Sequence, residues 1–172
     1  MKPDAQISDL RAALLAWYDH HNREMPWRSN PEPWWVWVSE IMLQQTRVES
    51  VIGYFKRFME RFPTPAHLAE ADLDELMGYW AGLGYYARAR NLHAGATQVV
   101  REHGGEVPDD PAAFAELKGV GRYTCAAVQS IAFNHPLAVL DGNVIRVIAR
   151  LDHITEDPKS ASVNRALWAR AD

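Results

Sequence analysis

The sequence has one cysteine, Cys125, and this scarcity excludes two kinds of site. A disulfide needs two cysteines, so no disulfide framework can stabilise the chain from within. A thiolate metal site also needs several cysteines, so we expect no metal site formed by this chain alone. Because a free cysteine behaves as a small apolar residue, we expect Cys125 to lie in the core.

Long apolar runs are missing too. No stretch approaches the roughly 20 apolar residues that a membrane-spanning helix needs. The start, Met1-Lys2-Pro3-Asp4, lacks the apolar segment of a secretory signal peptide. We therefore expect a cytoplasmic protein that has no membrane partner.

An excess of positive charge is also absent, since the formal net charge is −4. Any affinity for DNA must then come from a local patch and not from bulk charge. Residues 116–151 provide one candidate patch, where cations outnumber anions: Lys118, Arg122, Arg146 and Arg150 against Glu116 and Asp141. The seven tryptophans and six tyrosines could fill a core or stack on bases.

The sequence does show helical periodicity. Apolar residues recur at helical intervals through residues 34–62. Further helices are predicted over residues 72–80, 85–103, 111–117, 122–133, 141–152 and 159–171. No run alternates with period two, so we predict an all-α fold, and 48% apolar residues are enough for a sizeable core.

Gly119-Val120-Gly121 lies between two apolar helical segments and is typical of a helix-hairpin-helix turn. Both glycines permit a positive φ and the close approach of another backbone. The helix that starts at Arg122 would point its free N–H groups at phosphate oxygens. Such contacts bind nucleic acid without reading its sequence. An ordinary helix C-cap would explain the same glycines, so this motif alone leaves both interpretations open.

Two carboxyl residues are the candidates for chemistry. Glu40 is flanked in sequence by Trp34, Trp35, Trp37, Ile41 and Met42, and poor solvation would raise its pKa and keep it protonated near neutral pH. Helical spacing predicts Gln44 and Arg47 on the same face. Asp141 has the features of a helix N-cap, a role compatible with catalysis. An acid paired with an ionised carboxylate is the arrangement that cleaves glycosidic bonds, whereas a solvated Glu40 would have no such role.

Five segments resemble one protein family. They are Pro26-Trp27-Arg28, Ser39–Thr46 (SEIMLQQT), Gly82–His93 (GLGYYARARNLH), Gly119–Arg122 and Leu140–Arg146 (LDGNVIR). Together they resemble the adenine DNA glycosylases of the MutY type, within the helix-hairpin-helix superfamily that includes endonuclease III. The resemblance covers the chain from about Leu14 onward.

The resemblance implies a base-excision-repair glycosylase that hydrolyses the N-glycosidic bond of adenine mispaired with 8-oxoguanine or guanine. Glu40 matches the acid that protonates the adenine ring, Asp141 the carboxylate that stabilises the sugar cation, and Asn143 its supporting amide. Tyr123 occupies the position of the lysine found in bifunctional relatives, which implies a monofunctional enzyme. Further residues match positions that contact the base or the DNA: Arg28, Gln45, Thr46, Leu83, Tyr85, Gly119, Gly121 and Arg122.

The same resemblance implies a helical barrel lobe over residues 21–133 and a second lobe from residues 1–20 and 134–172. Family members carry four cysteines that hold a [4Fe-4S] cluster, then a domain that recognises 8-oxoguanine. Neither part lies within these 172 residues, so we expect the second lobe to be incomplete. The expected partner is duplex DNA with an adenine mispair, bound by a monomer.

Two alternatives stay open at this point. The first is a bifunctional glycosylase/lyase of the endonuclease III kind, which both Glu40 and Tyr123 disfavour. The second is a non-catalytic DNA-binding fragment that keeps the hairpin but cannot turn over substrate.

Overall fold

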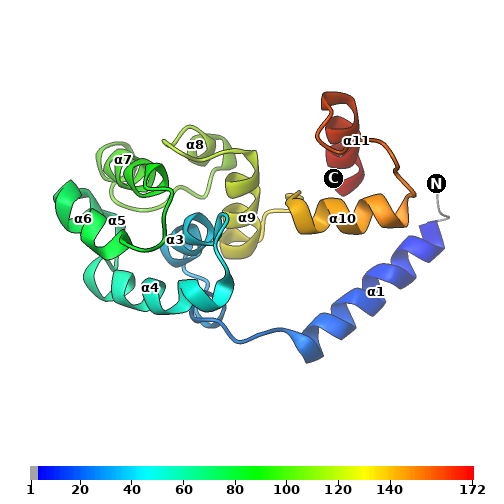
Figure 1. The fold of residues 1–172 in the computed structure, drawn as a ribbon, viewed down its shortest axis with the longest axis horizontal. Coiled ribbons are helices and arrows are strands. Elements are labelled where there is room, and N and C mark those ends of the chain that lie inside the picture. The colour runs from blue at the N-terminus through cyan, green and yellow to red at the C-terminus, as the bar shows by residue number, and fades with distance from the viewer. Residues whose placement is uncertain (1–3) are drawn as a thin grey trace.

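A computed structural model describes residues 4–172, which form eleven α-helices and no β-strand (Figure 1). The all-α prediction is confirmed. The helices are α1 (Asp4–His21), α2 (Pro26–Ser29), α3 (Pro33–Leu43), α4 (Val48–Arg61), α5 (Pro65–Ala69), α6 (Leu73–Trp80), α7 (Ala87–Glu102), α8 (Pro111–Ala115), α9 (Arg122–Phe133), α10 (Gly142–Leu151) and α11 (Ala161–Ala171). Among residues 4–172, no helix is both long enough and apolar enough to cross a membrane.

Proline marks where several of these helices begin. It occupies an opening position of α2, α3, α5 and α8. The fixed φ of proline suits the first turn, where a missing N–H costs nothing. The Thr64 and Asp110 side chains then accept hydrogen bonds from free N–H groups at the starts of α5 and α8.

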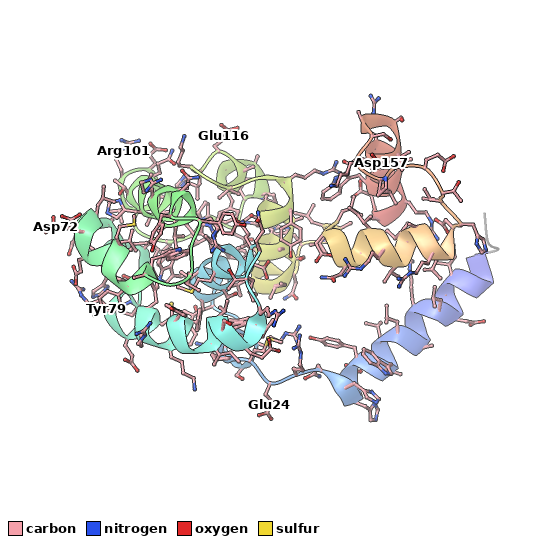
Figure 2. All side chains as sticks on the ribbon, viewed as in Figure 1. Glu24, Asp72, Tyr79, Arg101, Glu116 and Asp157 are labelled. Atoms are coloured by element: carbon pink, nitrogen blue, oxygen red, sulfur yellow. The ribbon has the colours of Figure 1, made fainter. Side chains whose placement is uncertain are left out.

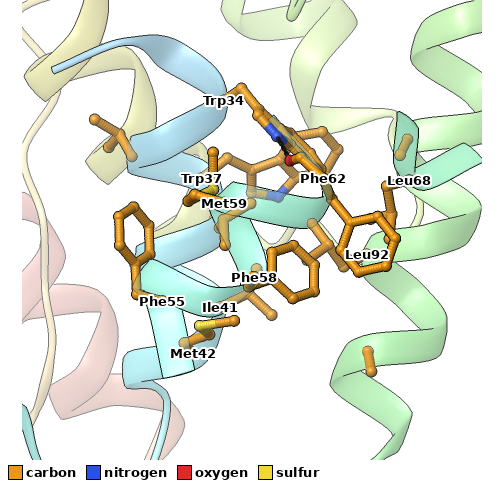
Figure 3. Close-up of a cluster of buried hydrophobic side chains, with 14 of the residues drawn as sticks. Trp34, Trp37, Ile41, Met42, Phe55, Phe58, Met59, Phe62, Leu68 and Leu92 are labelled. Atoms are coloured by element: carbon orange, nitrogen blue, oxygen red, sulfur yellow. Dashed lines mark hydrogen bonds between the residues drawn. The ribbon is translucent and has the colours of Figure 1, made fainter. Parts of the chain in front are cut away.

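The core surrounds α3, which packs against α4, α7 and α9 (Figure 3). Trp37 is fully buried and meets Phe114 edge to face, with ring centroids 5.2 Å apart. Trp27, Trp34 and Trp80 are buried as well, so these tryptophans fill the core and are not free to stack on bases. Cys125 is only 8% exposed, which confirms its expected place in the core.

The segment predicted as helical over residues 34–62 is two helices, α3 and α4, separated by a turn at residues 44–47. Gln45 in this turn has a φ of +57°. Arg47 lies outside α3, as the N-cap of α4. The prediction that Arg47 shares a helical face with Glu40 is therefore wrong, because the helix ends at Leu43.

Figure 1 shows α3–α9 on one side of the molecule and α1, α10 and α11 on the other. A segment from Asn134 to Asp141 joins α9 to α10, next to the predicted lobe boundary at residue 133. The division into a barrel lobe and an incomplete second lobe remains a prediction. Charged side chains such as Asp72, Arg101 and Glu116 project from the outside of the larger side (Figure 2).

Candidate active site

A pocket of about 740 Å³ lies between the larger group of helices and the start of α10. Eight of the residues singled out in the sequence line it: Arg28, Glu40, Gln44, Gln45, Thr46, Tyr123, Asp141 and Asn143. They come from α2, α3, the α3–α4 turn, α9 and the start of α10. The fold thus brings together residues that are far apart in the sequence.

Glu40 lies in the last turn of α3, and its side chain is partly buried in this pocket. Burial raises the pKa of the Glu40 carboxyl above its ordinary value of 4.5, and the negative charge of Asp141 acts in the same direction. The hydrogen bond from Tyr123 and the charge of Arg28 oppose this rise but do not cancel it. The raised pKa keeps a larger fraction of Glu40 protonated near neutral pH.

Tyr123, in the first turn of α9, donates its hydroxyl to Glu40 Oε2 at 3.0 Å. Burial, followed by the nearby charge of Glu40, raises the pKa of the Tyr123 phenol. The phenol therefore remains a donor at physiological pH. It fixes one carboxyl oxygen of Glu40 and leaves the other free to carry a proton.

Asp141 caps α10, as the sequence predicted. Its Oδ1 accepts hydrogen bonds from the backbone N–H groups of Asn143 (3.0 Å) and Val144 (2.8 Å). Its Oδ2 accepts a bond from the Asn143 side-chain amide at 2.7 Å. Three donors thus fix the orientation of the carboxylate at the pocket wall, and Asn143 supplies two of them.

Other residues that line the pocket were not singled out in the sequence, among them Tyr18, Arg23 and Ile131. The Arg28 guanidinium lies 5.6 Å from the centroid of the Tyr18 ring and donates to the Arg23 carbonyl at 3.3 Å. α1 therefore reaches the pocket through Tyr18. No local motif marks Tyr18, because its place beside Arg28 is a contact between separate elements.

Leu83 and Tyr85, predicted to contact DNA, lie in the α6–α7 loop and do not line the pocket. Leu83 is 6% exposed, so its side chain belongs to the core of this structure. Tyr85 is 60% exposed and has a φ of +48°, so its ring projects from the loop.

The hairpin precedes α9. Gly119 has a φ of +82°, and a Cβ there would lie 2.6 Å from the Asn91 Cβ, so this position requires glycine. Gly121 does not adopt the positive φ that glycine permits: with φ −97° and ψ 174° it is the extended N-cap of α9. No side chain caps this helix start, which leaves its first N–H groups available to a ligand.

Arg122, also predicted to bind DNA, makes contacts within the protein. Its guanidinium lies 3.7 Å from the Trp168 ring centroid and 3.2 Å from Asp172 Oδ2. The side chain connects the hairpin to α11 while remaining largely exposed.

The described residues do not fit an iron-sulfur cluster, which needs four thiolates. Cys125 is the sole cysteine, and its thiol donates to the Pro111 carbonyl at 3.4 Å. Within residues 4–172, no group of three or more His, Cys, Asp or Glu side chains is placed to hold a metal ion.

Comparison with known proteins adds three observations from sequence. Residues 38–172 match the model of the HhH-GPD superfamily of base excision DNA repair proteins. The human adenine DNA glycosylase is 46% identical over 97% of this chain, and that of Mycobacterium tuberculosis is 42% identical over 92%. The chain spans 32% of the human protein and 52% of the mycobacterial one.

Two solved structures are similar in fold. A thermostable thymine-DNA glycosylase superimposes with a TM-score of 0.84 and 27% identity, over 95% of this chain and 76% of that one. A trapped endonuclease III–DNA covalent intermediate superimposes with a TM-score of 0.81 and 26% identity, over 100% of this chain and 79% of that one.

Proposed function

The chain belongs to the HhH-GPD superfamily of base excision DNA repair proteins, and on this basis we propose that it is a monofunctional adenine DNA glycosylase. It would hydrolyse the N-glycosidic bond of adenine mispaired with 8-oxoguanine or guanine in duplex DNA. The enzyme would act as a monomer. The observation that carries this proposal is the Tyr123–Glu40 hydrogen bond in a pocket shared with Asp141.

Glu40 would act as the general acid. A base stacked inside a duplex cannot reach this pocket, so adenine must first rotate out of the helix. Protonation of a ring nitrogen by Glu40 turns the base into a neutral leaving group. The raised pKa of Glu40 supports this role, because an acid is most effective when its pKa lies near the working pH.

Asp141 would stabilise the positive charge that develops on the sugar as the glycosidic bond breaks. The three hydrogen bonds from residues 143 and 144 orient its carboxylate before the substrate arrives. Water then adds to the sugar carbon, which leaves an abasic site and free adenine.

The hairpin would provide affinity that does not depend on sequence. The uncapped start of α9 presents N–H groups suited to a phosphate oxygen. Since the protein carries a net charge of −4, such local contacts would have to replace a general electrostatic attraction.

Adenine release from defined duplexes tests the activity. We expect single-turnover release of free adenine where it lies opposite 8-oxoguanine or guanine, and no release opposite thymine. The experiment requires the full-length protein. Release of mispaired thymine with no release of adenine would overturn the proposal, and would point to the specificity named for one structural neighbour.

A second measurement separates monofunctional from bifunctional chemistry. Among the described residues, no lysine lines the pocket, and Tyr123 occupies the position next to Glu40. We therefore expect borohydride to trap no covalent protein–DNA adduct with the wild-type protein, because an imine requires an amine. Tyr123→Lys serves as the positive control. A strong covalent adduct with the wild-type protein would contradict monofunctional chemistry and favour the lyase alternative.

A further inference from the structure

Arg88, in the first turn of α7, binds the end of a different helix. Its Nη1 donates to the backbone carbonyls of Ile41 (2.9 Å), Met42 (3.0 Å) and Gln44. The last carbonyls of an α-helix have no partner within the helix, and a cation near them is favourable. Arg88 therefore caps the C-terminal end of α3, directly after the turn that carries Glu40.

The other terminal nitrogen of Arg88 binds two loops, the α6–α7 loop and the α3–α4 turn. Its Nη2 donates to the carbonyls of Leu83 (3.1 Å) and Gly84 (3.2 Å) in the α6–α7 loop. The same nitrogen donates to Thr46 Oγ1 (3.3 Å) in the α3–α4 turn. One guanidinium thus connects two segments that are about forty residues apart in the sequence.

Each of these segments contains a non-glycine residue with a left-handed backbone. Gln45 has a φ of +57° and Tyr85 a φ of +48°, conformations that cost free energy and persist only where the surroundings impose them. Arg88 binds the carbonyl of the residue directly before each one, Gln44 and Gly84. Both Gln45 and Tyr85 are exposed, so the strained backbone directs their side chains outward.

We propose that Arg88 is a positioning residue that fixes the α3–α4 turn and the α6–α7 loop relative to each other, so that Gln45 and Tyr85 meet the DNA duplex together. This inference rests on the proposed function for its DNA part. The fixing of the two loops is a property of the free protein and can be tested without DNA.

Arginine suits this role better than lysine does. The planar guanidinium offers donors from two nitrogens in a fixed arrangement, whereas a lysine amine places all its donors on one nitrogen. The guanidinium also lies 5.5 Å from the ring centroids of Trp80 and Tyr85, which add cation–π contacts.

Hydrogen exchange tests whether Arg88 fixes the two loops. The variants are Arg88→Met, Arg88→Lys and the control Arg90→Met. Arg90 is the exposed arginine two positions further along α7. The reporting amides are Thr46 N–H, which donates to the Leu43 carbonyl, and Leu83 N–H, which donates to the Trp80 carbonyl. In both Arg88 variants we expect exchange in peptides that contain these amides to be about tenfold to a hundredfold faster, the usual effect of losing hydrogen bonds to a charged group.

Two other amides report on the stability of the whole fold. Phe62 N–H donates to the Phe58 carbonyl, and His103 N–H donates to the Val99 carbonyl. Their exchange should be unchanged in Arg88→Lys and in Arg90→Met. Unchanged exchange at Thr46 and Leu83 would overturn the proposal. An equal increase at all four amides would overturn it too, because Arg88 would then support the fold as a whole.

The claim that Gln45 and Tyr85 meet the duplex together is tested by measuring the affinity of the full-length protein for DNA. For Arg88→Lys we expect the ratio of affinities for adenine-mispair and undamaged duplexes to fall about tenfold or more, because lost hydrogen bonds to a charged group cost about 1.5–3 kcal/mol each. An unchanged ratio would overturn the DNA part of the proposal. Arg90→Met should keep the wild-type ratio. A wild-type protein that releases no adenine would refute the proposed function, while the exchange result would still decide the role of Arg88.

Discussion

Replacing Glu40 with glutamine is expected to reduce the rate of adenine release by about 10²–10⁴-fold, the usual contribution of a general acid. The amide keeps the size of the carboxyl and can still accept the Tyr123 hydroxyl, so the pocket should keep its shape. It cannot donate the proton that makes adenine a leaving group. Single-turnover kinetics would measure the rate, and equilibrium binding should show nearly unchanged affinity for the duplex.

The pH dependence gives this prediction a second readout. A general acid works only when protonated, so the wild-type rate should fall as pH rises through the raised pKa of Glu40. The residual rate of Glu40→Gln should lose that decline. Glu60→Gln, an exposed change on α4, is the matched control and should behave as wild type. A near-wild-type rate in Glu40→Gln would remove this residue from the mechanism.

Replacing Gly121 with valine is expected to weaken binding to every duplex about tenfold or more, because hydrogen bonds to charged groups contribute about 1.5–3 kcal/mol each. A Cβ at Gly121 meets no protein atom within 4 Å, and the backbone there is extended, so valine should fit without a steric clash. The added side chain would instead cover the N–H groups at the start of α9. Titration with mispaired and undamaged duplexes, alongside thermal unfolding, measures both effects.

Two comparison variants make the hairpin test specific. Gly119→Val should also lower the stability of the protein, because residue 119 has a positive φ and its Cβ would meet Asn91. Gly53→Val adds the same side chain at an open site on α4 and should leave binding unchanged. If Gly121→Val lost affinity only for adenine mispairs, the hairpin would not act through phosphate.

Local patterns predicted most of the helices, while tertiary contacts decided the details that they missed. The break between α3 and α4 has no glycine or proline to announce it. Gln45 adopts its left-handed backbone beside a carbonyl bound by Arg88, a contact between residues 44 positions apart. Arg88 and Arg90 look equivalent in the sequence, and only the fold shows that the first is partly buried and hydrogen-bonded to two loops.

In the candidate site too, some features follow from the local sequence and others from contacts between distant residues. The N-cap role of Asp141 is local, and the sequence was sufficient to predict it. The hydrogen bond between Tyr123 and Glu40 joins residues 83 positions apart and becomes visible only in the structure. The extended backbone of Gly121 was missed because glycine permits many conformations, and its presence does not say which one is used.

The buried environment of Glu40 also has a thermodynamic consequence for the protein without DNA. Its pKa is higher in the folded state than in the unfolded chain, so the folded state binds the proton more tightly. Folding stability must then decrease as pH rises between the two pKa values, and it stays reduced above them. At neutral pH this carboxyl therefore opposes folding. The residue proposed as the general acid is one that selection for stability alone would replace, so the proposed activity and stability make opposite demands at this position.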